Sequence, residues 1–165
     1  LEFRRVLFRS GFVHRDLKPS NLFMFPGGVR VGDMGSAVEA GRRVRVAGTL
    51  HTIDPTLTGK RWYRAHWSQD MWAVGVIFHL MATGRHPLGF LTIGAGRMAP
   101  EDMVLALRHG PAVVIQPPYS DPQSSLLHKL CVAMLEKDPA NRPTAAMALA
   151  ALRLMDPWAC PSSTK

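Results

Sequence analysis

The sequence predicts a mainly helical domain with one short β-hairpin near its start. Two short apolar strands flank a Pro-Gly-Gly turn, which is typical of a hairpin. An apolar run over residues 71–81 suits a buried helix, because it is apolar on almost every side and too short to span a membrane. The 165 residues, 47% of them hydrophobic, suffice for one packed domain and exclude a disordered chain.

The hairpin is the first predicted element, with Phe23-Met24-Phe25 and Val29-Arg30-Val31 as its strands and Pro26-Gly27-Gly28 as its turn. Residues 36–68 follow it. They show no sustained hydrophobic period and carry clusters of Gly, Thr and Arg, so we expect a long loop. A loop of that length inside a compact domain usually has a function.

Helices dominate the rest of the sequence. Ser68-Gln69-Asp70 can cap a helix over Met71–Met81, with Asp70 as the capping residue, and Thr83-Gly84 can end it. That helix is apolar on every face except at His79, so we expect it in the core. Further helices are predicted over Pro100–Arg108, Ser124–Leu135 and Pro143–Met155.

Charge and cysteine content exclude several classes of protein. Residues 1–10 match the translation of a common sequencing adaptor, so we treat them as an artefact. They carry three Arg and one Glu, and their removal lowers the formal net charge from +8 to +6. The remaining Lys and Arg are scattered and form no nucleic-acid-binding motif, which argues against a nucleic-acid partner. Two cysteines without a CxxC spacing exclude a disulfide scaffold and a structural zinc site.

No apolar run approaches the ~20 residues that span a bilayer, so we expect no membrane partner. We expect an intracellular, cytoplasmic protein. Its targeting signals and its oligomeric state are not readable from these residues.

The stretch from His14 to Asn21 carries the chemistry. It offers Asp16 and Lys18 ahead of Asn21, and Asp33 follows directly after the hairpin. Because a hairpin brings its ends together, we expect Asn21 and Asp33 to converge on one point. An amide oxygen and a carboxylate suit Mg²⁺, which also binds substrate phosphates. Asp16 can accept the proton of an incoming hydroxyl, and Lys18 can neutralise charge on a transferring phosphoryl group.

This pattern resembles the eukaryotic-type protein kinases. His14 to Asn21 is similar to the catalytic loop of that family. Four later motifs resemble, in the family's order, the metal-binding triplet, the end of the activation loop, the start of the central buried helix and a late Arg-Pro motif. They are Asp33-Met34-Gly35, Gly48-Thr49, Asp70-Met71-Trp72-Ala73-Val74-Gly75 and Asp138-Pro139-Ala140-Asn141-Arg142-Pro143.

The resemblance implies a Ser/Thr kinase, because Lys18 is followed by Pro19 and because Thr49 is similar to the threonine that contacts the catalytic Asp and Lys. It implies ATP and Mg²⁺ as cofactors and a protein as substrate. Asp16 would be the base, and Lys18 would stabilise the phosphoryl group. Asn21 and Asp33 would hold the metal ion and, through it, bind the nucleotide.

The resemblance also implies structural and regulatory roles. Asp70 would hold the catalytic-loop backbone from beneath, and Arg15 would receive a phosphate from the activation loop. Thr49 and Thr52 are the candidate phosphate acceptors, with Thr52 slightly favoured. The loop also contains the cluster Arg42, Arg43 and Arg45. We interpret it as a solvated basic loop, with a docking site for acidic substrates or a phosphate as the alternative.

One triplet departs from the family pattern. The family's Ala-Pro-Glu stands here as Asp54-Pro55-Thr56, and its Glu would pair with the arginine that corresponds to Arg142. We hypothesise that Asp54 reaches Arg142 instead. The departure motivates an alternative function, a pseudokinase that acts as a scaffold or allosteric partner without phosphotransfer. The retained Asp16, Lys18 and both metal-ligand candidates argue against it.

The resemblance further implies a division of the chain. Residues 11–155 would be the C-terminal lobe of a kinase domain, with the N-terminal lobe missing, and 156–165 would begin a linker or tail. No Gly-rich phosphate-covering loop, strand Lys or helix Glu precedes the catalytic loop. We therefore expect the chain as written to bind ATP poorly and to be inactive on its own.

Overall fold

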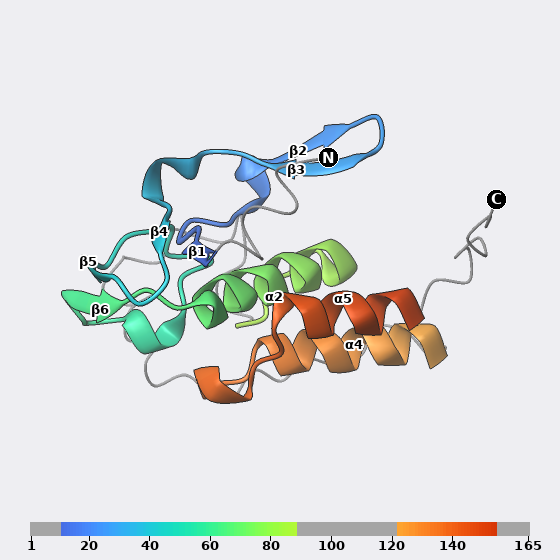
Figure 1. The fold of residues 1–165 in the computed structure, drawn as a ribbon. Helices are drawn as coiled ribbons and strands as arrows, with labels where there is room; N and C mark the ends of the chain where they lie inside the picture. Colours follow the sequence, from blue (N-terminus) through green and yellow to red (C-terminus); the bar gives the residue numbers. More distant parts are fainter. Residues whose placement is uncertain (1–10, 89–121, 155–165) are drawn as a thin grey trace.

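The computed structural model describes residues 11–88 and 122–154. Within them, helix α2 lies between three small two-stranded sheets on one side and helices α4 and α5 on the other (Figure 1). The helices are α2 (Trp67–Thr83), α4 (Pro122–Met134) and α5 (Ala145–Leu154). The strands are β1 (Phe12–Val13), β2 (Leu22–Phe25), β3 (Gly28–Val31), β4 (Val38–Glu39), β5 (Arg43–Arg45) and β6 (Trp62–Arg64). Single 3₁₀ turns are η1 (Pro19–Asn21), η2 (Met34–Ser36), η3 (Pro55–Leu57) and η4 (Pro139–Asn141).

Helix α2 begins four residues earlier than predicted. His66 is its N-cap, and a capping box joins His66 to Gln69: the Gln69 side chain accepts from the His66 N–H at 3.0 Å. The prediction that Asp70 caps the helix is therefore wrong, because Asp70 lies inside the first turn. The predicted end is confirmed, since Gly84 adopts φ 67° and its N–H donates to the Leu80 carbonyl.

The helices pack closely because α2 carries a glycine at the contact. A Cβ on Gly75 would lie 2.8 Å from the Met134 Cβ and 2.9 Å from the Leu135 Cγ, so no larger residue fits between α2 and α4. Buried Trp72 and Cys131 line the same core. Burial raises the pKa of the Cys131 thiol to about 11, so this thiol is unreactive at neutral pH. The predicted helices over 124–135 and 143–155 are confirmed within one or two residues.

The predicted hairpin is confirmed as the pair β2–β3. Its register places Phe25 opposite Gly28 and Leu22 opposite Val31, so Pro26 and Gly27 form a two-residue turn. Leu22 and Val31, at its base, pack against a cluster that includes residues of α2. The hairpin is thereby fixed with its open end beside the catalytic loop.

The prediction of an unstructured loop over residues 36–68 is wrong in part. Strand β4 pairs with β1, and β5 pairs with β6. These strands have two or three residues each, which is too short for an alternating pattern to stand out in the sequence. Their inward side chains, such as Val13, Tyr63 and Val44, share one core cluster.

The predicted helix over 100–108, the adaptor-like residues 1–10 and the predicted tail over 156–165 lie outside the described residues. Among the helices that are described, none combines the length and the apolar character needed to cross a membrane.

Candidate active site

Asp70 of α2 holds the catalytic loop from beneath. Its carboxylate accepts hydrogen bonds from the backbone N–H groups of His14 at 2.7 Å and Arg15 at 2.9 Å. Arg15 has φ 72°, a conformation that costs energy for any residue except glycine, and the two hydrogen bonds help to maintain it. Burial raises the pKa of the Asp70 carboxyl, and the two N–H donors act in the opposite direction. The contact expected from the family resemblance is present.

His14 ties the catalytic loop to the base of the hairpin. Its side chain is fully buried, Nδ1 accepts from the Asp16 N–H at 3.3 Å, and Nε2 lies 3.0 Å from the Gly32 carbonyl. Because Nδ1 is an acceptor, Nε2 carries the proton and donates to Gly32. This histidine therefore positions the loop and is not exposed to a substrate.

The side chains of Asp16, Lys18 and Thr49 form a closed network. Lys18 Nζ donates to Asp16 Oδ2 at 2.7 Å and to Thr49 Oγ1 at 3.2 Å, while Thr49 Oγ1 donates to Asp16 Oδ1 at 2.7 Å. Burial alone would raise the pKa of the Asp16 carboxyl. The hydrogen bonds from Lys18 and Thr49 and the charge of Lys18 outweigh burial and hold this pKa below its ordinary value. Asp16 is therefore a carboxylate at neutral pH.

Asn21 and Asp33 lie at the two ends of the hairpin, where the Asn21 carbonyl accepts from the Gly32 N–H at 2.9 Å. The Asn21 side chain donates through Nδ2 to the Asp16 carbonyl at 2.9 Å. Within the described residues no donor occupies Oδ1 of Asn21 or the carboxylate of Asp33. One free amide oxygen and one free carboxylate fit Mg²⁺, a cation that takes oxygen ligands and keeps several waters. No group of three or more His, Cys, Asp and Glu in the described chain could hold a metal.

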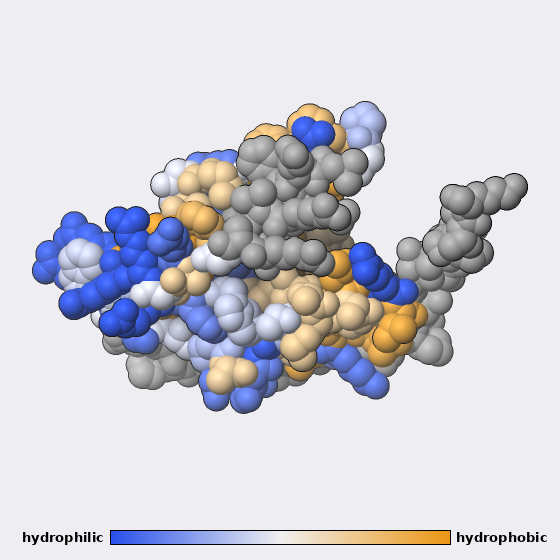
Figure 2. All heavy atoms as spheres, viewed as in Figure 1, coloured by the Kyte–Doolittle hydropathy of each residue, from blue (hydrophilic) through white to orange (hydrophobic). Residues whose placement is uncertain are grey.

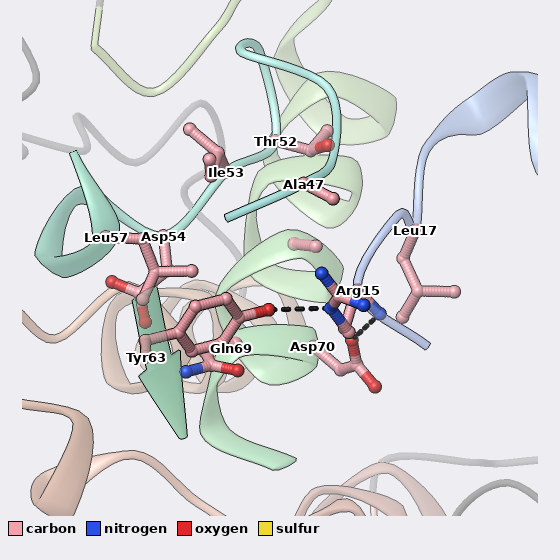
Figure 3. A pocket seen from close by; sticks show the side chains of 11 residues that line it. Arg15, Leu17, Ala47, Thr52, Ile53, Asp54, Leu57, Tyr63, Gln69 and Asp70 are labelled. Carbon is pink, nitrogen blue, oxygen red and sulfur yellow. Dashed lines mark hydrogen bonds between the residues drawn. The ribbon is translucent and has the colours of Figure 1, made fainter. Parts of the chain in front are cut away.

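Arg15 fastens the activation loop to the catalytic loop. Its Nε donates to the Tyr63 hydroxyl at 2.8 Å, Nη1 to the Ser36 carbonyl at 3.0 Å, and Nη2 to the Arg45 carbonyl at 2.6 Å. Figure 3 shows the Tyr63 hydroxyl facing this guanidinium. In the observed conformation, three of the five guanidinium N–H groups of Arg15 donate within the chain, and the expectation that Arg15 receives a phosphate stays a prediction.

Thr52 does not suit the role of phosphate acceptor that we favoured for it. Its side chain is buried with 4% exposure, and its hydroxyl donates to the Thr49 carbonyl at 3.4 Å. A kinase that phosphorylates Thr52 would have to unfold this segment first. Thr49, the other candidate, has its hydroxyl in the network with Asp16.

Gly48 allows the activation loop to approach the catalytic loop. It has φ 119°, and a Cβ at this position would lie 2.6 Å from the Arg15 carbonyl oxygen. A side chain is therefore excluded both by the backbone conformation and by the contact. Gly35 of the predicted metal triplet is less crowded, since a Cβ there would lie 3.4 Å from Asp33 Oδ1.

Asp54 pairs with Arg142, as hypothesised. Nη1 of Arg142 lies 2.5 Å from Asp54 Oδ2, Nη2 lies 3.2 Å from Oδ1, and both side chains are fully buried. Arg142 also donates to the carbonyls of Glu136 and Ser68 and lies over the Trp72 ring. The first residue of the altered triplet thus supplies the carboxylate that the last residue, Thr56, lacks.

The sequence did not reveal the partners of Arg15. Tyr63 lies 48 residues after Arg15, and the other two acceptors are backbone carbonyls, which carry no sequence signal. The alternation of exposed Trp62 and Arg64 around buried Tyr63 is visible only in the structure, because the sequence Arg61-Trp62-Tyr63-Arg64 does not alternate between apolar and polar residues.

Comparison with known proteins decides the family. The model of the protein kinase domain matches residues 4–152 and so includes the catalytic loop, the activation loop, helices α2 and α4 and most of α5. The chain belongs to the protein kinase family. The match begins within the segment 1–10 that we set aside as adaptor-like.

Several kinases have similar sequences. The chain is 31% identical over 145 residues to the inactive serine/threonine-protein kinase PLK5 of Mus musculus. This match covers 85% of the chain and 22% of PLK5. It is 30% identical over 152 residues to human ribosomal protein S6 kinase alpha-3, over 87% of this chain and 20% of that kinase. It is 30% identical over 141 residues to the serine/threonine-protein kinase plk-1 of Caenorhabditis elegans, over 81% of this chain and 19% of that kinase. The chain spans less than a third of the length of each of these relatives.

Proposed function

We propose that this chain contains the phosphotransfer site of a protein serine/threonine kinase and that residues 11–155 correspond to the C-terminal lobe of its kinase domain. The network of Asp16, Lys18 and Thr49 is the observation that carries the proposal. It places a carboxylate with a lowered pKa and an ammonium group within hydrogen-bond distance of each other. Protein hydroxyls would be the acceptors, and ATP would be the phosphoryl donor.

The geometry supports a division of labour. Asp16, held by Thr49 and Lys18, accepts the proton of the substrate hydroxyl. Lys18 turns its one remaining N–H donor to the transferring phosphoryl group, where negative charge accumulates. When bound, Mg²⁺ would neutralise charge on the nucleotide phosphates, and the free oxygens of Asn21 and Asp33 are the groups that would hold it.

The serine/threonine specificity rests on two supports. Thr49 stands where its hydroxyl contacts both Asp16 and Lys18, the arrangement that the family resemblance associates with Ser/Thr kinases. The relatives named above are all serine/threonine kinases or S6 kinases by name. We propose an intracellular, cytoplasmic enzyme that acts on proteins rather than on nucleic acids or membranes.

The test is transfer of labelled γ-phosphate from ATP to peptides that carry a single Ser, Thr or Tyr. The protein is expressed from its complete reading frame, with Mg²⁺ or with EDTA. We expect Mg²⁺-dependent label on the Ser and Thr peptides and none on the Tyr peptide. Label on Tyr alone, or no label on any peptide, would contradict the proposal. The 165-residue chain, which has no Gly-rich loop, is assayed in parallel and should be inactive.

A pseudokinase scaffold is the second candidate. The altered triplet Asp54-Pro55-Thr56 and the similarity to a protein that is named an inactive kinase favour it. The buried pair between Asp54 and Arg142 speaks against it, because the altered triplet still supplies a carboxylate to Arg142. Absence of phosphotransfer from a folded protein that still binds ATP would favour the pseudokinase.

A further inference from the structure

The antiparallel pair of strands β5 and β6 presents a strongly basic face to solvent. Its register places Arg43 opposite Arg64 and Arg45 opposite Trp62, while Val44 and Tyr63 form the inward pair. Figure 2 shows hydrophilic residues gathered at this end of the molecule. We call this surface the arginine ribbon. It consists of Arg42, Arg43, Arg45, Arg61, Trp62 and Arg64, all of them exposed.

The arginine ribbon forms no ion pair in the described part of the chain, and Arg64 Nη1 donates only to a backbone carbonyl, that of Gly41, at 3.2 Å. The two ion pairs found there are Lys18 with Asp16 and Arg142 with Asp54, and neither involves the ribbon. Two like charges placed directly opposite each other on a sheet face destabilise it, as Arg43 and Arg64 do here. Stability of the fold therefore does not explain this arrangement, whereas an anionic ligand would.

Trp62 organises the guanidinium groups. It is 46% exposed, and the Cζ atoms of Arg43 and Arg45 lie 5.8 and 5.6 Å from its ring centroid. Cation–π attraction to the ring restrains both guanidinium groups near Trp62, and no hydrogen bond from either group is found within the described residues. The N–H edges of guanidinium groups match carboxylates, which accept two parallel hydrogen bonds from one guanidinium.

The arginine ribbon is fastened to the catalytic loop. Arg15 precedes Asp16 and donates to the Arg45 carbonyl of β5 and to the Tyr63 hydroxyl of β6. The arginine ribbon is therefore one arginine side chain away from the loop that carries Asp16. This position favours a protein segment over a nucleic acid as the ligand.

We infer that the arginine ribbon binds acidic residues next to the phosphorylated Ser or Thr of the substrate. The inference rests on the proposed function, since it specifies the substrate class of the same site. The ligand is an extended segment rich in Asp and Glu. Its carboxylates would lie on the ribbon and offset the repulsion between Arg43 and Arg64.

Binding of labelled peptides to the 165-residue chain, measured by fluorescence anisotropy, tests this inference. One peptide carries a Ser flanked by Asp and Glu, and its control has Asn and Gln in their place. We expect the acidic peptide to bind at least about tenfold more tightly, with an affinity that falls steeply as salt is added. Equal affinity for the two peptides, or tighter binding of a single-stranded oligonucleotide of similar charge, would overturn the inference.

Variants locate the binding surface. The triple variant R43Q/R45Q/R64Q should lose at least about tenfold in affinity for the acidic peptide. K129Q/R153Q, which removes two exposed charges from α4 and α5, should bind like the wild type. Equal loss in both variants, or none in either, would overturn the inference. The charge reversal R43E/R45E provides a second criterion that loss of folding cannot mimic, because it should favour a basic peptide.

Two readouts separate this inference from the proposed function. Peptide binding requires no phosphotransfer, so the wild-type chain should still bind the acidic peptide more tightly than the neutral peptide when no ATP is present. The protein from the complete reading frame should also show a higher kcat/KM for the acidic than for the neutral peptide. Phosphotransfer with equal kcat/KM for both would contradict the arginine ribbon alone, whereas selective binding without phosphotransfer would contradict the proposed function alone.

Discussion

At the scale of single residues, the pair of Asp54 and Arg142 accounts for the altered triplet. A buried arginine without a carboxylate would be left as an uncompensated charge. Asp54 lies two residues before the position where the family has Glu, and its side chain is shorter. It reaches Arg142 because it also caps η3, where its Oδ1 accepts from the Thr56 N–H at 2.9 Å. The same carboxylate thus serves a turn and an ion pair.

Removal of this carboxylate should be costly. We expect D54N to lower the free energy of unfolding by about 3–5 kcal/mol, because the Arg142 charge remains buried without its partner. Urea unfolding followed by circular dichroism measures the change. E39Q, which neutralises an exposed carboxylate on β4, is the matched control and should unfold like the wild type. An unfolding free energy of D54N equal to that of E39Q would show that the pair does not stabilise the fold.

Gly48 offers a second test with a close control. Gly48 and Gly41 both have positive φ, but a Cβ on Gly48 would collide with the Arg15 carbonyl, whereas a Cβ on Gly41 would meet nothing within 4 Å. G41A should cost about 1 kcal/mol for the backbone conformation alone. G48A should cost more and should also expose the amides of the catalytic loop to hydrogen exchange. Equal unfolding free energies for the two variants would contradict the close approach.

The sequence predicted contacts between motif residues better than contacts to the backbone. The network of Asp16, Lys18 and Thr49 followed from the family resemblance, and each of its members has a side chain that the motif specifies. The acceptors of Arg15 could not be predicted in the same way, since two are carbonyl oxygens that any residue provides. Burial of Thr52 was also missed, because a threonine in a loop carries no sign of its exposure.

At the scale of elements, the side chain of Arg15 connects the arginine ribbon to the catalytic loop. Arg15 Nε reaches β6 through the Tyr63 hydroxyl, and Nη2 reaches β5 through a carbonyl. The activation loop is thereby ordered without a phosphate. Short strands such as these could be predicted only weakly from the sequence, whereas the long apolar helix and the hairpin with its Pro-Gly turn could be predicted well.

The Tyr63 hydroxyl should matter for this order. Y63F keeps the ring in the core and removes only the acceptor of Arg15 Nε. Because the Arg15 guanidinium would then lack one partner, we expect faster hydrogen exchange at the amides of β5 and β6, with the exchange of α2 unchanged. Mass spectrometry of exchanged peptides measures both regions. The same exchange rate in β5 and β6 of Y63F and wild type would mean that Tyr63 does not fasten the ribbon.

At the scale of the whole molecule, acid should weaken the fold through a buried histidine. His86 lies beyond α2 with 3% exposure. Its Nδ1 accepts from the Leu88 N–H at 3.1 Å, so Nε2 carries the proton and donates to the His51 carbonyl at 2.7 Å. Burial lowers the pKa of His86 to about 4, and the hydrogen bond to His51 opposes this shift only in part.

The sign of the pH effect follows from this pKa. An unfolded histidine takes up a proton near pH 6.5, whereas His86 in the fold stays neutral until about pH 4. Stability is therefore fully present above pH 6.5 and falls as the pH drops toward 4, by about 2 kcal/mol at pH 5. Urea unfolding at pH 7.5 and pH 5 measures it. H86Q, which keeps a donor for the His51 carbonyl, should lose less stability over this range, and an equal loss would contradict the assignment.

The central position of helix α2 could be predicted from the sequence, because apolar residues cover nearly all of its surface. Helix α2 is apolar on nearly all sides and lies in the middle of the molecule (Figure 1). Its start was misplaced because His66 is not among the common N-cap residues, so Ser68-Gln69-Asp70 looked like the better cap. The close packing of α2 on α4 depends on Gly75, whose role becomes visible only when Met134 and Leu135 lie against it.

The most direct test of the central claim is the phosphotransfer rate of D16N, measured with the protein from its complete reading frame and labelled ATP. Because the proposed function makes Asp16 the acceptor of the substrate proton, we expect the rate to fall roughly 10²- to 10⁴-fold while the thermal unfolding midpoint stays close to that of the wild type. E39Q, a change of the same type on an exposed carboxylate, should keep the full rate. A folded D16N that transfers phosphate as fast as E39Q would contradict the account.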